Sequence, residues 1–199
     1  MSASNWQHPM REILGAVQLY SKWGFDVYRT SFKDDELFQR YIDYIRKAMI
    51  RRCDSDGAGD VASAVTLYTK EGQGGINLNG LSVDEVRKLH MESVATRERD
   101  GGQADGYFML VNGEVLERFH VAEEELAKEN RKPEYVGEGV VVIMCLGYEE
   151  EEADDDESDM MWQFVQADAV AEFYNMVSGD GEWWFTSFAW PPDAYGTMA

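Results

Sequence analysis

The sequence predicts an α+β domain built on a mixed, largely antiparallel sheet that is covered by helices. Strand-like stretches rich in β-branched and aromatic residues alternate with helix-like stretches whose apolar residues recur every three or four positions. No segment rich in proline, glycine or serine divides the chain, so residues 1–199 are interpreted as a single domain. Hydrophobic residues make up 44% of the sequence and aromatic residues 13%, which is enough for a substantial core. Ferredoxin-like βαβ units are one way to build such a sheet.

The N-terminal half begins with a short helix at 10–20 and a strand at 23–32 in which apolar and polar residues alternate. A helix from Asp34 to Arg52 follows, because acidic residues occupy its first turn and basic residues its last, as the helix dipole favours. The other elements of this half are a loop at 54–60, a strand at 61–69, a glycine-rich connection at 72–80 and a helix from 82 to about 99 that opens with the capping box Ser82–Glu85.

The C-terminal half contains Asn112-Gly113, the dipeptide typical of a tight hairpin turn. We therefore expect strands at 106–111 and 115–121 on either side of it, or one longer bulged strand, and a short helix at 122–130. The run 140–148 is continuously apolar and β-branched, which predicts a central strand buried on both faces. The remaining elements are an acidic, flexible loop at about 149–159, a strand at 160–165, a helix at 168–177 and an aromatic closing strand at 183–190 with Trp184, Phe188 and Trp190 on one face.

The formal charge of −20 excludes several classes of partner. Such a field repels phosphate backbones and anionic membrane surfaces, and no basic stripe reverses it, so we predict no nucleic acid and no membrane partner. A basic protein partner, self-association or a small-molecule ligand fits better. The N-terminus lacks the apolar stretch of a signal peptide, and no run is long enough to cross a membrane, which favours an intracellular protein, cytoplasmic or nuclear.

The two cysteines do not form a disulfide framework. Cys145 lies inside the apolar run at 140–148, which predicts a buried thiol that packs as a small hydrophobic group. Cys53 is placed in a polar loop directly after Arg51 and Arg52, where positive charge could lower its pKa.

One segment resembles a known group of proteins. Trp23-Gly24-Phe25-Asp26-Val27-Tyr28-Arg29, followed by Asp34-Asp35, is similar to the opening of a large group of uncharacterised fungal intracellular proteins. In that group a strand of the type Trp-Gly-Phe-x-x-Tyr-Arg leads through a short acidic turn into a helix. The similarity continues loosely through residues 120–124, the acidic loop and the aromatic segment near Pro191-Pro192. The resemblance implies a fungal origin and carries over no activity.

Metal and cofactor motifs are weak. Asp54, Asp56 and Asp60 form the string most like a calcium loop, but Ala58 and Val65 stand where an EF-hand needs oxygen ligands, so an ordinary polar turn is favoured. The acidic run at 149–159 supplies charge without a fixed cage of oxygens. An iron site from His90, His120 and Glu124 can be drawn, although nothing in the spacing requires it. Phosphate-binding, dinucleotide and nucleophile-elbow motifs are missing, so no cofactor is predicted.

Two functional hypotheses remain. The leading one is a non-catalytic acidic binding or interaction protein, which should present a flat, exposed aromatic patch. The alternative is a small-molecule enzyme or ligand carrier that uses carboxylate acid–base groups in an aromatic-lined pocket. The candidate residues for that pocket are Asp26, Tyr28, Arg29, Asp34, Asp35 and His120.

Overall fold

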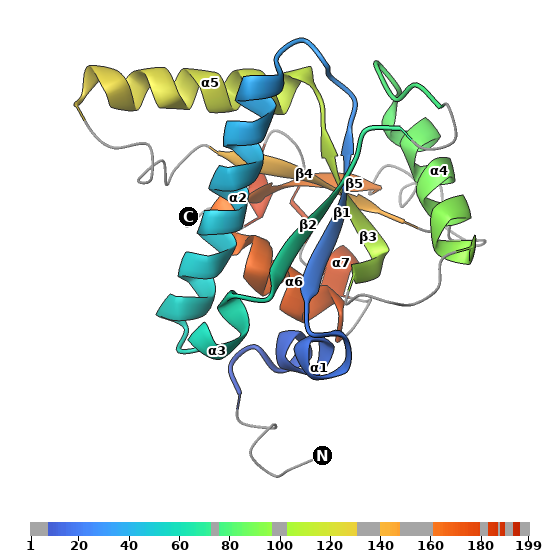
Figure 1. Cartoon of the computed structure of the whole chain (residues 1–199), viewed down its shortest axis with the longest axis vertical. Helices are drawn as coiled ribbons and strands as arrows, with labels where there is room; N and C mark the ends of the chain where they lie inside the picture. The colour runs from blue at the N-terminus through green and yellow to red at the C-terminus, as the bar shows by residue number, and fades with distance from the viewer. Residues whose placement is uncertain are drawn as a thin grey trace.

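A six-stranded mixed sheet forms the centre of the molecule in a computed structural model that describes residues 8–72, 76–96, 103–130, 140–147, 161–179, 183–186, 188–189 and 193–195 (Figure 1). The strand order is β2-β1-β3-β4-β5-β6. The strands are β1 (Trp23–Arg29), β2 (Val65–Lys70), β3 (Gln103–Val111), β4 (Val141–Leu146), β5 (Trp162–Gln166) and β6 (Ala194–Tyr195). The predicted α+β class and mixed sheet are confirmed.

Parallel pairing is more extensive than the sequence suggested. Strand β1 pairs in parallel with both β2 and β3, and β5 pairs in parallel with β6, while β3–β4 and β4–β5 are antiparallel. Helix α2 (Asp35–Ser55) separates β1 from β2, and α4 (Val83–Thr96) separates β2 from β3. Each helix carries the chain back along the sheet, so the next strand runs parallel to the one before it. The two helices lie on opposite faces of the sheet (Figure 1).

The first strand and helix form as the sequence predicts. All seven residues of β1 are buried, since the strand has a neighbour on each side and helices over both faces. Helix α2 begins after Asp34, whose side chain accepts a hydrogen bond from the backbone N–H of Leu37. The predicted helix before β1 is also present, as α1 (Arg11–Tyr20). Helix α2 continues to Ser55 and α3 (Gly59–Ala62) follows, so the strand predicted from residue 61 begins only at Val65.

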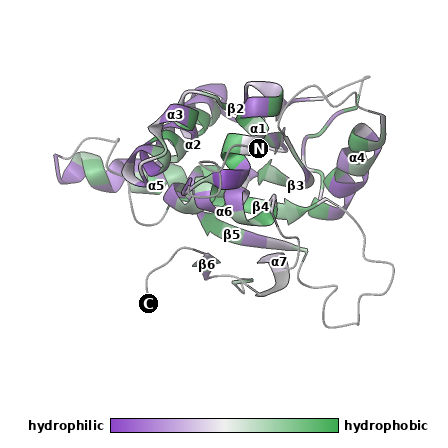
Figure 2. Ribbon diagram, turned by 90° about the horizontal axis from the view of Figure 1, so that it is seen from below, coloured by the Kyte–Doolittle hydropathy of each residue, from purple (hydrophilic) through white to green (hydrophobic). Residues whose placement is uncertain are grey.

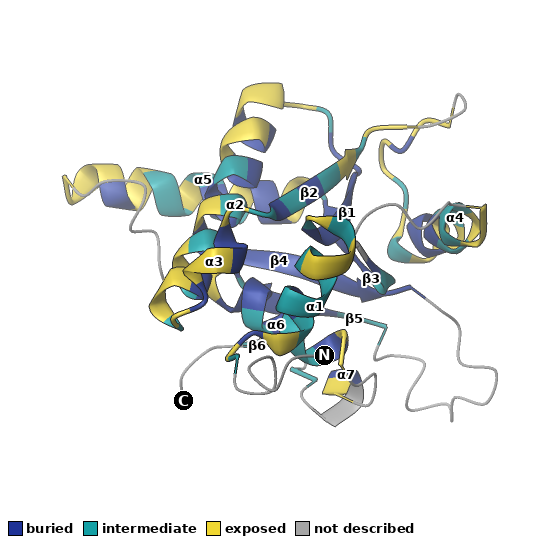
Figure 3. Ribbon diagram, turned by 60° about the horizontal axis from the view of Figure 1, so that its bottom comes forward, coloured by how far each residue is buried: buried dark blue, intermediate teal, exposed yellow. Residues whose placement is uncertain are grey.

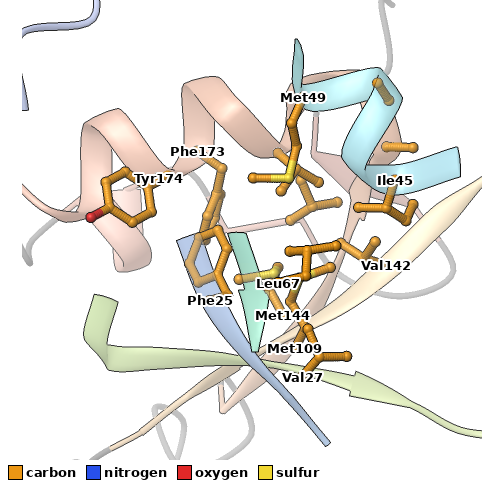
Figure 4. Close-up of a cluster of buried hydrophobic side chains, with 14 of the residues drawn as sticks. Phe25, Val27, Ile45, Met49, Leu67, Met109, Val142, Met144, Phe173 and Tyr174 are labelled. Carbon is orange, nitrogen blue, oxygen red and sulfur yellow. The ribbon is translucent and has the colours of Figure 1, made fainter. Parts of the chain in front are cut away.

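The main hydrophobic core lies between the sheet and the layer that contains α2 and α6 (Val170–Val177) (Figure 4). The close-up shows side chains from four neighbouring strands meeting those of the two helices. They are Phe25, Val27, Leu67, Met109, Val142 and Met144 from the sheet, and Ile45, Met49, Phe173 and Tyr174 from the helices. The predicted central strand at β4 is confirmed, because all six of its residues are buried.

Helix α4 covers part of the opposite face. Its capping box is formed as expected: the backbone N–H of Ser82 donates to Glu85 Oε2 at 2.8 Å, and the Glu85 N–H donates to Ser82 Oγ at 3.3 Å. Within α4, Val86, Arg87 and His90 are buried. In the burial view the exposed residues lie mostly on the outer faces of the helices, while β1 and β4 are dark blue (Figure 3).

The prediction of a hairpin at Asn112-Gly113 is wrong. Asn112 is instead the N-cap of α5 (Gly113–Lys128), and its side-chain oxygen accepts from the N–H groups of Glu114 and Val115. The apolar residues that looked like a strand recur at helical spacing and face α2 and β4, with Val115, Leu116, Phe119 and Leu126 buried. Asn is favoured at both kinds of position, so the dipeptide did not distinguish them. The far turns of α5 carry both hydrophilic and hydrophobic residues (Figure 2).

The prediction of a closing aromatic strand at 183–190 is also wrong. Residues 183–186 form the short helix α7 (Trp183–Thr186), and the last strand is β6, paired with β5. Trp184 is fully buried against Tyr107 and Phe173, so its ring fills the core rather than one face of an edge strand. Trp190 and the acidic loop at 149–159 lie outside the described residues. None of the described helices is long and apolar enough to span a membrane.

Candidate functional site: a pocket beside a buried polar cluster

Strand β1 presents two polar side chains to the face covered by α4. Asp26 and Tyr28 are two residues apart and therefore point to the same side of the sheet. They are 1% and 4% exposed, respectively. Side chains of this kind are seldom so deeply buried in a strand unless partners compensate for the lost water.

His90 of α4 is the central partner of this cluster and is 1% exposed. Its Nε2 lies 2.9 Å from the carbonyl oxygen of Asp105, and its Nδ1 lies 3.3 Å from the Tyr28 hydroxyl. A carbonyl oxygen only accepts hydrogen bonds, so Nε2 carries a proton and donates it. The second nitrogen therefore faces Tyr28 and, at 3.7 Å, Oδ2 of Asp26. The imidazole thus connects all three groups.

Packing also fixes the ring of His90. The ring meets Tyr28 edge-on, with centroids 5.7 Å apart, and lies 4.8 Å from the ring of Phe108. Gly147 lies against its other side: a Cβ atom at this position would come within 2.7 Å of His90 Cδ2. The absence of a side chain at Gly147 therefore makes room for the imidazole.

Lys70 brings a positive charge to the same carboxylate. It is the last residue of β2, and its Nζ lies 3.7 Å from Oδ1 of Asp26. Asp26 thus has a lysine near one oxygen and a histidine near the other.

A pocket of about 300 Å³ opens beside this cluster. It lies between the end of β2, the segment that follows it and the second half of α4. Tyr28 and Lys70 form part of its wall, so the pocket meets the polar cluster there. The remaining lining residues are Gly72, Ile76, Leu78, Leu89, Glu92, Ser93 and Thr96. A cavity of this size, with apolar walls and a few polar groups, is typical of a site for a small metabolite.

The predicted candidates therefore separate into two groups. Arg29 points to the other face of β1, where its guanidinium lies over the rings of Phe32 and Phe38. Its Cζ atom is 4.7 and 4.3 Å, respectively, from the two ring centroids. It also donates to Asp35 Oδ1 at 2.6 Å and to the Ser31 carbonyl at 2.8 Å. Arg29, Asp34 and Asp35 thus hold the β1–α2 connection together. They do not line the pocket.

The other predicted site residues lie elsewhere. His120 is in the middle of α5, where it is half exposed and paired with Glu124 at 3.5 Å. It is not at the end of a strand, because the predicted strand there is helix α5. The histidine near the pocket is His90, a buried residue of α4. Among the described residues no group of three or more His, Cys, Asp or Glu side chains is arranged to hold a metal ion.

The aspartates of the calcium-like string have structural partners. Asp56 caps the end of α2 and forms an ion pair with Arg52, while Asp60 in α3 lies 3.2 Å from His8. Asp54 is in the last turn of α2 and is exposed. The string is therefore split between two helices and does not wind around a common centre.

The structure corrects the prediction for Cys53. It lies in α2 and is fully buried, and burial together with the nearby carboxylates raises the pKa of its thiol to about 11. The neighbouring arginines therefore do not activate it. Burial likewise raises the pKa of Cys145, as expected for a core thiol, and both cysteines are free.

The sequence identifies Asp26 and Tyr28 as candidate pocket residues, but it gives no sign of Lys70. Only the pairing of β1 with β2, which sets Tyr28 beside Lys70, brings this lysine to the site. Comparisons with protein-family models, with curated proteins and with solved structures find no match to this chain.

Proposed function

We propose that this protein binds a small organic molecule in the pocket next to Asp26, Tyr28 and His90, as a ligand carrier or an enzyme. The observation that carries the proposal is that a pocket of about 300 Å³ has both Tyr28 and Lys70 in its wall. This is the arrangement expected of the small-molecule alternative, namely a concave apolar site on which polar groups converge.

The lining suggests what kind of molecule fits. Lys70 is a hydrogen-bond donor, and Tyr28 has a hydroxyl that both donates and accepts, so together they suit a carbonyl or carboxylate oxygen. Leu78, Leu89 and Ile76 suit an apolar body. The net charge of −20 disfavours ligands with several negative charges. A neutral or singly charged carbonyl compound or carboxylic acid agrees best with these features.

The interaction-protein hypothesis remains a prediction based on the acidic charge. The large apolar side chains that are exposed among the described residues are Leu19, Ile76, Val121 and Trp183. They belong to α1, to the segment after β2, to α5 and to α7. This distribution gives no specific support to a flat aromatic docking surface.

Ligand-observed saturation-transfer NMR tests the proposal with a library of small ketones, aldehydes and carboxylic acids. We expect several members to bind the wild type. Ser93→Trp fills the pocket and should abolish their signals, whereas Ala95→Trp, which adds the same ring to an exposed position on the same helix, should not.

A second pair of variants tests the charge. Lys70→Met should weaken carboxylate binding about tenfold, because it removes the positive charge and keeps the length of the side chain. Lys88→Met removes the same charge from an exposed position of α4 and should have little effect. Binding that is unchanged in both Ser93→Trp and Lys70→Met would refute the proposed site.

A further inference from the structure

We propose that Tyr28 is a catalytic acid–base residue that moves a proton on a carbonyl compound held in the pocket, with His90 and Asp26 as its positioning residues. This inference rests on the proposed function and adds a reaction to it. It is built on the chain of groups that runs from the pocket wall at Tyr28, through His90, to the buried carboxylate of Asp26.

The hydrogen bond of His90 to a carbonyl sets the direction of the chain. Because Nε2 donates to the carbonyl oxygen of Asp105 at 2.9 Å, the lone pair of the neutral ring is on Nδ1. The Tyr28 hydroxyl, 3.3 Å away, can therefore donate its proton to Nδ1. This follows the general pattern of an activated side chain: a hydroxyl (Tyr28), a histidine base within reach of it (His90), and a third group that orients the base.

The surrounding charges favour the transfer. Passing the proton from Tyr28 to His90 produces a phenolate and an imidazolium, both of which are unfavourable in a dry interior when they lack partners. Asp26 lies 3.7 Å from His90 Nδ1 and stabilises the imidazolium. Lys70, which shares the pocket wall with Tyr28, stabilises negative charge that develops nearby. The cluster thus supplies a partner for each charge formed.

The reaction is a proton transfer without oxidation or reduction. The phenolate oxygen of Tyr28 takes a proton from the carbon next to the substrate carbonyl: the C–H bond breaks, and a new O–H bond forms on Tyr28. The electron pair of the C–H bond moves to the carbonyl oxygen, and the resulting enolate lies beside the ammonium group of Lys70. The proton now on the Tyr28 hydroxyl exchanges with solvent through the open pocket, and Tyr28 returns a proton to the same carbon, which regenerates the carbonyl compound with a solvent-derived hydrogen. The proton on His90 then returns to the Tyr28 phenolate.

Solvent exchange measures this step directly. Library members that bind are incubated with the protein in D₂O, and ¹H NMR follows the loss of the signal from the carbon next to the carbonyl. Tyr28→Phe keeps the ring that packs on His90 and Phe108 but removes the hydroxyl. We expect it to lower the exchange rate by about 100-fold or more while affinity changes less than about threefold. Tyr20→Phe, on α1, serves as the control and should exchange at the wild-type rate.

His90→Gln separates a positioning role from a merely structural one. The glutamine retains a donor for Asp105 but cannot accept and hold a proton as the imidazole does. We expect a lower kcat with an unchanged KM, provided that the urea midpoint shows a folded protein.

The outcomes distinguish the two proposals. Ketones and aldehydes that bind the wild type without exchanging, or exchange that persists in Tyr28→Phe, would overturn the catalytic inference and leave the binding site intact. Failure of every member to bind would overturn the proposed function, and the catalytic inference with it.

Discussion

Gly24 provides a sharp stability test of this fold. It lies in β1 with a φ of +148°, a backbone conformation that residues other than glycine rarely adopt. A Cβ atom on Gly24 would lie 1.8 Å from the carbonyl oxygen of Thr66 in β2. Gly24 also marks the point where the pairing register of β1 with β3 shifts. Substitution by alanine should therefore disturb the pairing of β1 with β2 and with β3.

The size of the effect follows from these distances. The distance of 1.8 Å is about 1.2 Å less than the 3.0 Å minimum for real Cβ contacts. Strand β2 must therefore move away from β1, which weakens the hydrogen bonds between the two strands. Backbone strain of about 1–3 kcal/mol adds to one or two weakened hydrogen bonds worth about 1 kcal/mol each. We expect Gly24→Ala to lower the free energy of unfolding by about 2–5 kcal/mol, a large part of the total for a domain of this kind.

Gly15 is the matched control. It lies in the middle of α1, and a Cβ atom there would meet nothing within 4 Å. Gly15→Ala should therefore stabilise the protein by about 0.5–1 kcal/mol, because alanine is the better helix former. Urea unfolding, followed by far-UV circular dichroism, measures both variants from their midpoints and slopes. A Gly24→Ala protein within about 1 kcal/mol of the wild type would refute the assigned pairing of β1 with β2.

Three further predictions concern stability. Asn112→Ala should lower the free energy of unfolding by about 1 kcal/mol through loss of the α5 cap, while Asn112→Asp should have little effect in the same urea assay. Arg29→Lys should lower it by about 2 kcal/mol, because lysine cannot both stack between two rings and donate to Asp35 and Ser31; an unchanged urea midpoint would contradict this role. Stability should also fall between about pH 9 and pH 11. Burial raises the pKa of Cys53 to about 11 in the native state, whereas a thiol in the unfolded chain loses its proton near pH 8.5. Because the native state holds the proton over this window and the unfolded state does not, each buried thiol lowers the free energy of unfolding by up to about 1.4 kcal/mol per pH unit. Urea midpoints at pH 7, 9 and 10.5 test this, with Cys53→Ala as the variant in which the slope is reduced.

Local patterns predicted the elements whose signals agree with one another. The acidic first turn and basic last turn of α2 coincide with its apolar stripe, and the sequence therefore placed this helix well. The continuous apolar run at β4 was equally clear, because a strand buried on both faces needs apolar residues at every position. Ser82 and Glu85 identified the start of α4 through a contact between neighbours in the chain.

Local patterns failed where one residue type suits two structures. Asn112 can turn a hairpin or cap a helix, and only the burial of Phe119 against Tyr41 and Tyr44 of α2 decides for the helix. The aromatic segment around Trp184 has a similar ambiguity, since large rings favour strands but also fill gaps in a core.

The candidate site depended even more on distant contacts. Asp26 and Tyr28 share a strand, and their common direction could be read from the sequence. His90 lies 62 residues after Tyr28, and Lys70 belongs to the neighbouring strand, so their approach requires the complete β2-β1-β3 layer. No local pattern carries that information.

The position of β1 between β2 and β3 determines when its pairing can be completed during synthesis. It is the first strand to be made, yet one of its partners, β3, comes about 80 residues later. At about 5–20 residues per second, roughly 4–16 s pass between the end of β1 and the end of β3. During that interval one edge of this buried strand has no native partner, and the nascent chain is open to non-native pairing. Each time the protein is made, β1 must therefore stay soluble until Val111, the last residue of β3, has been added.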